Sequence, residues 1–366
     1  MEDIQNNVPV NDTDPEKALK KQCKKDFSLT GLKLSAFAIF VILVEIVWSV
    51  IFNTIEKKLN FEFPGYMSYI QILVCLHILG LAFAVLLFHF KPKVKLPSRK
   101  LGFWNFVLYL LATFGIGVPL ALVGNVISMI IAYLAGEDVL SANASLNIAT
   151  MGIDSLLGKA LMILVVVITA PIVEEHLFRK FLIDSIGKWG VIVSAVTSGL
   201  LFGLFHGNLS QFFFATFIGF IFANVYLRTG RVRYSIFMHM TVNGVNAIIM
   251  MLVSGLDLPR LQELSDEMLS FSTDAEAMAF LNNLSPADLS LLGGFMFYMM
   301  FIGFYLLFVF AGFVLFIVFF KKIFFYEKPF KSELPAGKVF LSGYLSIGMI
   351  LFFLVCIFQF AMYYIK

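Results

Sequence analysis

Five polar residues interrupt long apolar runs in this sequence, and together their side chains could provide acid–base chemistry and hydrogen-bond donors for a developing negative charge. They are Glu174, Glu175, His206, His239 and Asn243. Ionisable groups are costly at membrane depth, where they mark functional sites by default. The five residues are therefore the candidate catalytic set, and Arg179 and Phe202 are expected to shape the site.

The two adjacent glutamates have different expected surroundings. Glu175 and Arg179 stand four residues apart, so on a helix they share a face and can form an ion pair. Glu174 points about 100° away from Glu175 and lacks that partner. We expect Arg179 to hold Glu175 ionised, which leaves Glu174 free to take or give a proton.

This set is compatible with two kinds of hydrolytic chemistry. A carboxylate and a histidine can activate a water, while a second histidine and an asparagine donate to a developing oxyanion. Alternatively, Glu174, His206 and His239 are the ligand types of a catalytic zinc site that keeps one position for water. The residue types leave both open, although the HExxH motif of zinc peptidases does not occur in the sequence.

The elements that must position these residues are predicted to be membrane-spanning helices. The 366 residues are 60% hydrophobic and 14% charged, with a mean hydropathy of +0.89, whereas a soluble domain carries about 25% charged residues. Apolar segments of spanning length predict an all-α, polytopic membrane helix bundle with about nine transmembrane helices, of which the fifth is short. The segments are 32–53, 67–90, 103–135, 156–187, 190–206, 210–228, 233–254, 291–320 and 339–365.

The distribution of charge predicts how the chain is oriented. Lys and Arg concentrate near the N-terminus and in the loops 91–102, 228–233 and 321–338, while loop 255–290 holds seven acidic residues and one base, Arg260. Every second loop is basic, so we expect a multi-pass cell-membrane protein with a cytoplasmic N-terminus and an extracytoplasmic C-terminus.

These observations divide the chain into five segments. They are a mobile polar cytoplasmic tail (1–30), N-terminal transmembrane helices (31–154), a core with the candidate catalytic set (155–254), an acidic extramembrane loop (255–290) and C-terminal transmembrane helices (291–366). Cys23, Cys75 and Cys356 lie far apart without metal-ligand spacing, so we expect free thiols.

Residue counts along the helices predict the depth of each side chain. Counted from the inner ends of their spans, Glu174 lies at roughly 20 Å, His206 at roughly 24 Å and His239 at only about 9 Å. Glu174 and His206 should therefore lie at similar depth. The count leaves His239 short of it, so either the seventh helix starts deeper than its apolar run suggests or the site lies on a slant. His77 and His89 have no comparable companions and are interpreted as ordinary core histidines.

Three motifs together resemble the CAAX protease and bacteriocin-processing family, also called the Abi family. They are Glu174-Glu175-x-x-x-Arg179, Phe202-x-x-x-His206 and His239-x-x-x-Asn243, in this order on apolar segments. The resemblance covers about residues 155–250, and the first three and last two predicted spans lie outside it.

The resemblance implies an all-helical intramembrane endopeptidase. Eukaryotic members of the family trim prenylated CAAX proteins, and bacterial members are linked to peptide processing and bacteriocin self-immunity. Carried over to this sequence, Glu174 and His206 activate the water, His239 and Asn243 stabilise the oxyanion, and Glu175 with Arg179 shapes the site. Family members are commonly labelled metalloproteases, so a divalent metal such as zinc is one expectation. The same residues also support a metal-free glutamate mechanism, which we favour.

The predicted function is hydrolysis of a membrane-associated peptide or protein within the lipid bilayer. The main alternative is a non-catalytic membrane immunity or regulatory protein built on the same scaffold. A proton-coupled transporter is disfavoured because no inverted repeat is visible. Membrane topology accounts for the basic segments, so we expect no nucleic-acid partner.

Overall fold

The computed structural model describes residues 14–89, 94–135, 152–324 and 332–364. Within these ranges the regular structure is entirely helical, and eight helices are long and apolar enough to cross a membrane. They are α1 (Pro15–Leu59), α2–η1–α3 (Met67–Phe88), α4 (Phe103–Ala135), α6–η2–α7–η3–α8–η4 (Leu156–Trp189), α10 (Leu209–Thr229), α11 (Val232–Ser254), α14 (Pro286–Val318) and α17 (Ile347–Tyr364).

The remaining helices are shorter. They are α9 (Val191–Phe205), α12 (Leu258–Leu269), α13 (Asp274–Asn283), α15 (Phe320–Phe324) and α16 (Ala336–Tyr344). As predicted, the fifth apolar segment is short, because α9 has only 15 residues. The predicted last span, 339–365, is divided between α16 and α17.

The first helix begins earlier than the sequence suggested. Residues 1–30 were predicted to be a mobile tail, but α1 starts at Pro15, directly after its N-cap Asp14. Cys23, Phe27 and Thr30 recur at helical spacing and are completely buried, and the Cys23 thiol donates to the carbonyl of Val339 in α16. The tail prediction is therefore wrong for residues 15–30, because their apolar face packs against the end of the chain. Residues 1–13 lie outside the described residues.

Glycines let several helices cross at very short range. A Cβ on Gly115 of α4 would collide with the backbone of Gly312 and Phe313 in α14, and a Cβ on Gly312 would collide with the backbone of Leu111. Membrane helices gain little from hydrophobic burial against lipid, so they depend on such close packing. α10 packs between α4 and α9, which makes these three helices the centre of the bundle.

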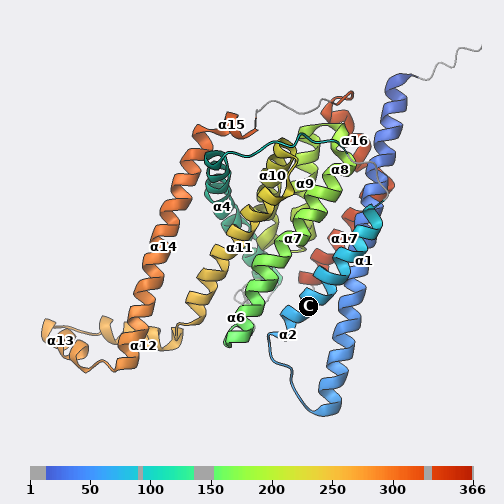
Figure 1. Ribbon diagram of the computed structural model, residues 1–366. Helices are drawn as coiled ribbons and strands as arrows, with labels where there is room; N and C mark the ends of the chain where they lie inside the picture. Colours follow the sequence, from blue (N-terminus) through green and yellow to red (C-terminus); the bar gives the residue numbers. More distant parts are fainter. Residues whose placement is uncertain (1–13, 90–93, 136–151, 325–331, 365–366) are drawn as a thin grey trace, which may run out of the picture.

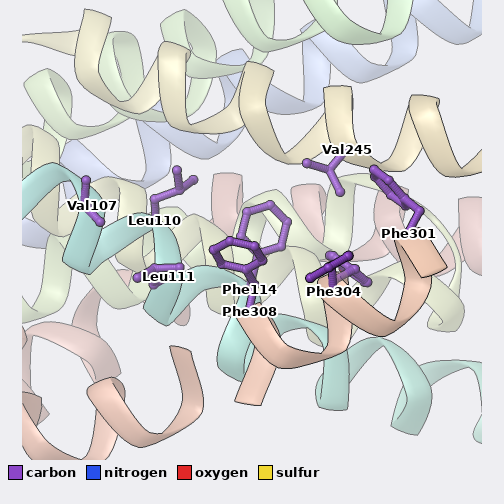
Figure 2. A pocket seen from close by; sticks show the side chains of 9 residues that line it. Val107, Leu110, Leu111, Phe114, Val245, Phe301, Phe304 and Phe308 are labelled. Carbon is purple, nitrogen blue, oxygen red and sulfur yellow. The ribbon is translucent and has the colours of Figure 1, made fainter. Parts of the chain in front are cut away.

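An apolar cavity of about 390 Å³ lies between α4, α11 and α14. Figure 2 shows its lining, which includes Leu110 and Phe114 of α4, Val245 of α11, and Phe301 and Phe304 of α14. Much of α14 is exposed, and Phe304 retains 58% of its accessible surface. An exposed apolar helix of this length is what a lipid-facing span requires.

The polar segments gather at opposite ends of the bundle. Figure 1 shows α12 and α13 at the end opposite to α15 and α16. Residues 94–102 of the basic loop 91–102 contact the turn between α10 and α11, at the end of the bundle where α15 and α16 lie (Figure 1). In this contact the Arg99 amide donates to the carbonyl of Thr229. This arrangement agrees with the predicted alternation of basic and acidic loops. Which end faces the cytoplasm stays a prediction.

Candidate active site

The helix that carries both glutamates changes its hydrogen-bond register twice. Between Leu156 and Trp189 it contains two π-helical segments, η2 (Ile163–Thr169) and η3 (His176–Phe181), which flank the α-helical turn α7 (Ala170–Glu175). π-Helical turns are rare and occur frequently at functional sites. Glu174 and Glu175 end the turn between them.

Pro171 explains an unusual contact of this helix with α11. In a π-helix each amide donates to the carbonyl five residues earlier, as the amide of Ala170 does to the carbonyl of Val165. In the same register the carbonyl of Val166 would accept the amide of residue 171. Proline has no N–H, which leaves the Val166 carbonyl without its helical partner. Asn243 of α11 supplies the missing donor, because its Nδ2 lies 2.8 Å from that oxygen. A partly buried carbonyl is thereby satisfied by a residue of the candidate set.

The predicted ion pair of Glu175 and Arg179 is confirmed. Arg179 Nε lies 3.0 Å from Glu175 Oε2, and both side chains are completely buried. The guanidinium also lies over the ring of Phe202, 4.5 Å from its centroid, and 5.6 Å from that of Phe222. Aromatic faces stabilise a desolvated guanidinium, so Phe202 and Phe222 help Arg179 to neutralise Glu175.

His239 joins the two glutamates. Its Nδ1 lies 3.0 Å from Glu175 Oε1, and its Nε2 lies 3.8 Å from Glu174 Oε2. A carboxylate can only accept, so Nδ1 carries the proton and Nε2 is the nitrogen that faces Glu174. The two side chains therefore meet, although the residue count gave them unequal distances from the ends of their spans. Counting residues from loop ends assumes that helices start in one plane, whereas α11 runs at an incline through the bundle (Figure 1).

His206 lies at the C-terminal end of α9 and has one defined ring nitrogen. Its Nδ1 is 2.8 Å from the carbonyl oxygen of Phe202, so Nδ1 donates there and Nε2 is left as an acceptor. The ring of Phe202 contacts both histidines, with its centroid 4.7 Å from that of His206 and 5.8 Å from that of His239.

A tight turn holds His206 in place. Gly207 adopts φ +66°, in the left-handed region that favours glycine. Asn208 then caps α10 by accepting the Gln211 amide, and its Nδ2 donates to the carbonyl of His206 at 2.9 Å. The α9–α10 turn is thus tied to the catalytic candidate that precedes it.

The two glutamates differ in exposure as well as in partners. The side chain of Glu175 is completely buried, whereas that of Glu174 keeps 18% of its accessible surface. Glu175 is already compensated by Arg179 and bonded to His239, so it is not free to exchange protons. Glu174 is the carboxylate that a water could reach.

Sequence reasoning found most of these residues and missed several of their supports. The structure brings together six of the predicted residues, which are Glu174, Glu175, Arg179, Phe202, His206 and His239. The seventh, Asn243, bonds to the carbonyl of Val166 on the helix that carries the two glutamates. Pro171 was visible inside an apolar run and could have been recognised as a helix irregularity. Nothing in the sequence pointed to Phe222 of α10, because it is one of 43 phenylalanines.

The set Glu174, His206 and His239 does not fit a metal ion as these side chains are placed. Among the described residues, no group of three His, Cys, Asp or Glu side chains has the spacing that could hold a metal. We therefore derive no step through a metal.

Comparison with known proteins singles out the same part of the chain. Residues 156–245 match the family model described as Type II CAAX prenyl endopeptidase Rce1-like. The protein named "Putative membrane peptidase YdiL" of Bacillus subtilis (strain 168) is 35% identical over 92 residues, which cover 25% of this chain and 38% of that protein. The chain thus matches well under half of this relative's length, and no solved structure matches it.

The matched region contains every residue of the candidate set, from Glu174 to Asn243. Residues 156–245 are therefore similar to the Type II CAAX prenyl endopeptidase Rce1-like family, in agreement with the resemblance that the three motifs indicated.

Proposed function

We propose that this protein is an intramembrane endopeptidase that cleaves a membrane-associated peptide or protein. The observation that carries the proposal is the separation of two adjacent carboxylates. Glu175 is buried against Arg179, while Glu174 is partly exposed and faces His239 Nε2 at 3.8 Å. An acid–base catalyst needs one carboxylate that is free to exchange a proton, while the charged groups beside it stay fixed in position and in protonation state.

In the proposed mechanism Glu174 and His206 hold the attacking water. The water oxygen attacks the scissile carbonyl carbon while Glu174 accepts one of the water's protons. The acceptor nitrogen Nε2 of His206 orients the other O–H of the water. The amide becomes a tetrahedral oxyanion. Glu174 then returns its proton to the leaving nitrogen as the C–N bond breaks, so one water is divided between the two products.

His239 and Asn243 are proposed to stabilise the oxyanion. Asn243 uses one amide N–H on the Val166 carbonyl, and its second N–H remains to donate. His239 Nε2 donates when the ring carries both protons, and the carboxylate of Glu175, which lies 3.0 Å from His239 Nδ1, then compensates the charge of the ring. Preorganised donors of this kind contribute about 2.7–4 kcal/mol each to transition-state stabilisation.

The bilayer determines which substrates can reach the site. The spans that surround it expose apolar side chains, such as Phe237 of α11 and Ile168 of η2, so a peptide would approach from within or along the membrane. A membrane-associated peptide or protein meets this requirement.

The proposal is tested by cleavage in lipid vesicles with the purified, reconstituted chain. Glu174→Gln and His206→Ala should each lower kcat at least about a hundredfold, because each removes a partner of the water. His176→Ala is the matched control, because His176 follows Glu175 but bonds to the Ile172 carbonyl of its own helix. Wild-type rates in Glu174→Gln would sink the mechanism, and a cellular function that survives it would favour the non-catalytic alternative.

Metal dependence is tested on the same preparation. Because the donor set does not fit a metal, we expect chelation with 1,10-phenanthroline followed by dialysis to leave cleavage within about twofold of its starting rate. The bound metal is quantified before and after. Stoichiometric zinc whose removal abolishes cleavage, and whose return restores it, would contradict the metal-free mechanism but leave the peptidase proposal standing.

A further inference from the structure

A buried histidine outside the family-matched segment touches the catalytic helix. His77 of η1 (Leu73–Gly80) retains 4% of its accessible surface. Its Nδ1 lies 2.7 Å from Oγ1 of Thr169, the last residue of η2. No companion of His77 could be recognised from residue spacing, because its partner belongs to a different span 92 residues later.

The proton arrangement between these groups can be worked out. Thr169 has a single hydroxyl proton, and Oγ1 lies 3.2 Å from the carbonyl of Val165, which can only accept. Both contacts are satisfied together when His77 Nδ1 donates to Thr169 and Thr169 donates to Val165. The three groups then form a continuous chain from the second span into the π turn.

That π turn is the segment on which the active-site geometry depends. The Val165 carbonyl accepts the amide of Ala170 in the π register, and the neighbouring Val166 carbonyl accepts Asn243. Thr169 stands five residues before Glu174 in the same continuous helix. A change of register in this turn would rotate Glu174 and Glu175 relative to His239.

A space-filling role does not account for His77. An apolar side chain would fill the same position without the cost of burying an imidazole among membrane-spanning helices. Within the described residues, His77 Nε2 is also buried with no hydrogen-bond partner. In the described part of the chain, the one hydrogen bond of the ring is therefore its bond to Thr169.

We propose that His77 is a positioning residue for the active site. Through Thr169 it holds η2 in the π register and so sets the orientation of Glu174. This inference rests on the proposed peptidase function for its kinetic test, and on the η1–η2 contact alone for its structural test. It extends the functional unit to the second membrane span, beyond the segment that the family model matches.

The kinetic test uses His77→Ala, Thr169→Val and the double variant in lipid vesicles. Each single variant should lower kcat about tenfold with KM within about twofold of wild type, because small misplacements of catalytic groups are costly. The double variant should be no worse than either single variant, because both break one chain. His77→Asn, which keeps an N–H near the position of Nδ1, should recover most of the loss. His89→Ala, an exposed histidine at the end of the same span, is the matched control.

Three kinetic results would overturn the proposal. They are wild-type kcat in His77→Ala, additive losses in the double variant, and a His77→Asn variant as inactive as His77→Ala. Glu174→Gln is assayed beside them. If wild type and Glu174→Gln do not differ, the proposed peptidase function fails and the kinetic arm is replaced by the structural one.

The structural arm is hydrogen exchange in lipid nanodiscs, read by mass spectrometry on peptides that cover residues 163–175. His77→Ala and Thr169→Val should each speed exchange in this segment, while His89→Ala should not, because local opening follows the loss of a local contact. Unchanged exchange in both variants would overturn the positioning role whatever the activity.

Discussion

Pro171 affects the candidate active site through a hydrogen bond that its backbone cannot make. By lacking an N–H it leaves the Val166 carbonyl open, and Asn243 fills the gap from another helix. The proline thus creates the acceptor that holds a candidate oxyanion donor. In membrane helices, neighbouring helices commonly satisfy the groups that a proline frees.

Replacing this proline should separate stability from activity. In Pro171→Ala the restored N–H can bond to the Val166 carbonyl and release Asn243. We expect the unfolding free energy to rise by about 1 kcal/mol, because an interior proline costs a helix a hydrogen bond, while kcat falls about tenfold as the donor loses its anchor. Thermal unfolding in detergent and cleavage in vesicles measure the two effects. A variant with unchanged kcat would show that the Val166–Asn243 bond has no catalytic role.

At the scale of elements, the α9–α10 hairpin brings His206 to the site. α9 has 15 residues and is about 22 Å long, shorter than the roughly 30 Å hydrocarbon core. It therefore ends inside the protein, where non-helical backbone is tolerated only if protein surrounds it. The end of α17 provides this cover, because Tyr364 accepts the amide of Leu209 at 3.1 Å and Gln359 lies against Gly207.

The turn after His206 offers a test of this arrangement. Gly207→Ala should cost about 1–2 kcal/mol of stability at a positive φ and lower kcat about tenfold by moving the His206 ring. Gly303→Ala in α14 is the control, because an added Cβ there meets no atom within 4 Å. Unfolding temperature and cleavage rate are compared for both. Loss of stability with an unchanged kcat would mean that the turn does not position His206.

At the scale of the whole molecule, charge is sorted between the two ends of the bundle. The acidic helices α12 and α13 lie opposite to α15 and α16 (Figure 1). Arg260, the lone base of the acidic loop, is held by Asp288 at 2.9 Å and by Glu263 at 2.9 Å. These ion pairs raise the pKa of the Arg260 guanidinium above its usual value, so it stays charged across the physiological range. The acidic end keeps its net negative charge.

This sorting predicts the sidedness of the protein in the cell. In a background without Cys23, Cys75 and Cys356, all of which are free and buried, single cysteines are placed at the exposed positions Ser272 and Gly337. A membrane-impermeant maleimide should label Ser272→Cys on intact cells and Gly337→Cys only after permeabilisation, because the basic end should be cytoplasmic. The reverse pattern would invert the predicted topology.

Some of this protein follows from the sequence alone. Long apolar runs require helices, since only helices satisfy every backbone group locally in a single span of lipid. The four-residue spacing of Glu175 and Arg179 determined their ion pair, because that spacing shares a helix face. These are consequences of local periodicity, which a sequence carries in full.

Other features depended on contacts between distant segments. The depth of His239 could not be counted from loop ends, because helix tilt and stagger are set by packing against other helices. The burial of Cys23, Phe27 and Thr30 in α1 depends on α16 and α17, and the bond of His77 to Thr169 joins residues 92 positions apart. Spacing along the chain thus determined which residues could pair within one helix. Only tertiary packing decided which helix faces meet, and therefore which glutamate is buried with Arg179 and His239 and which is left open to water.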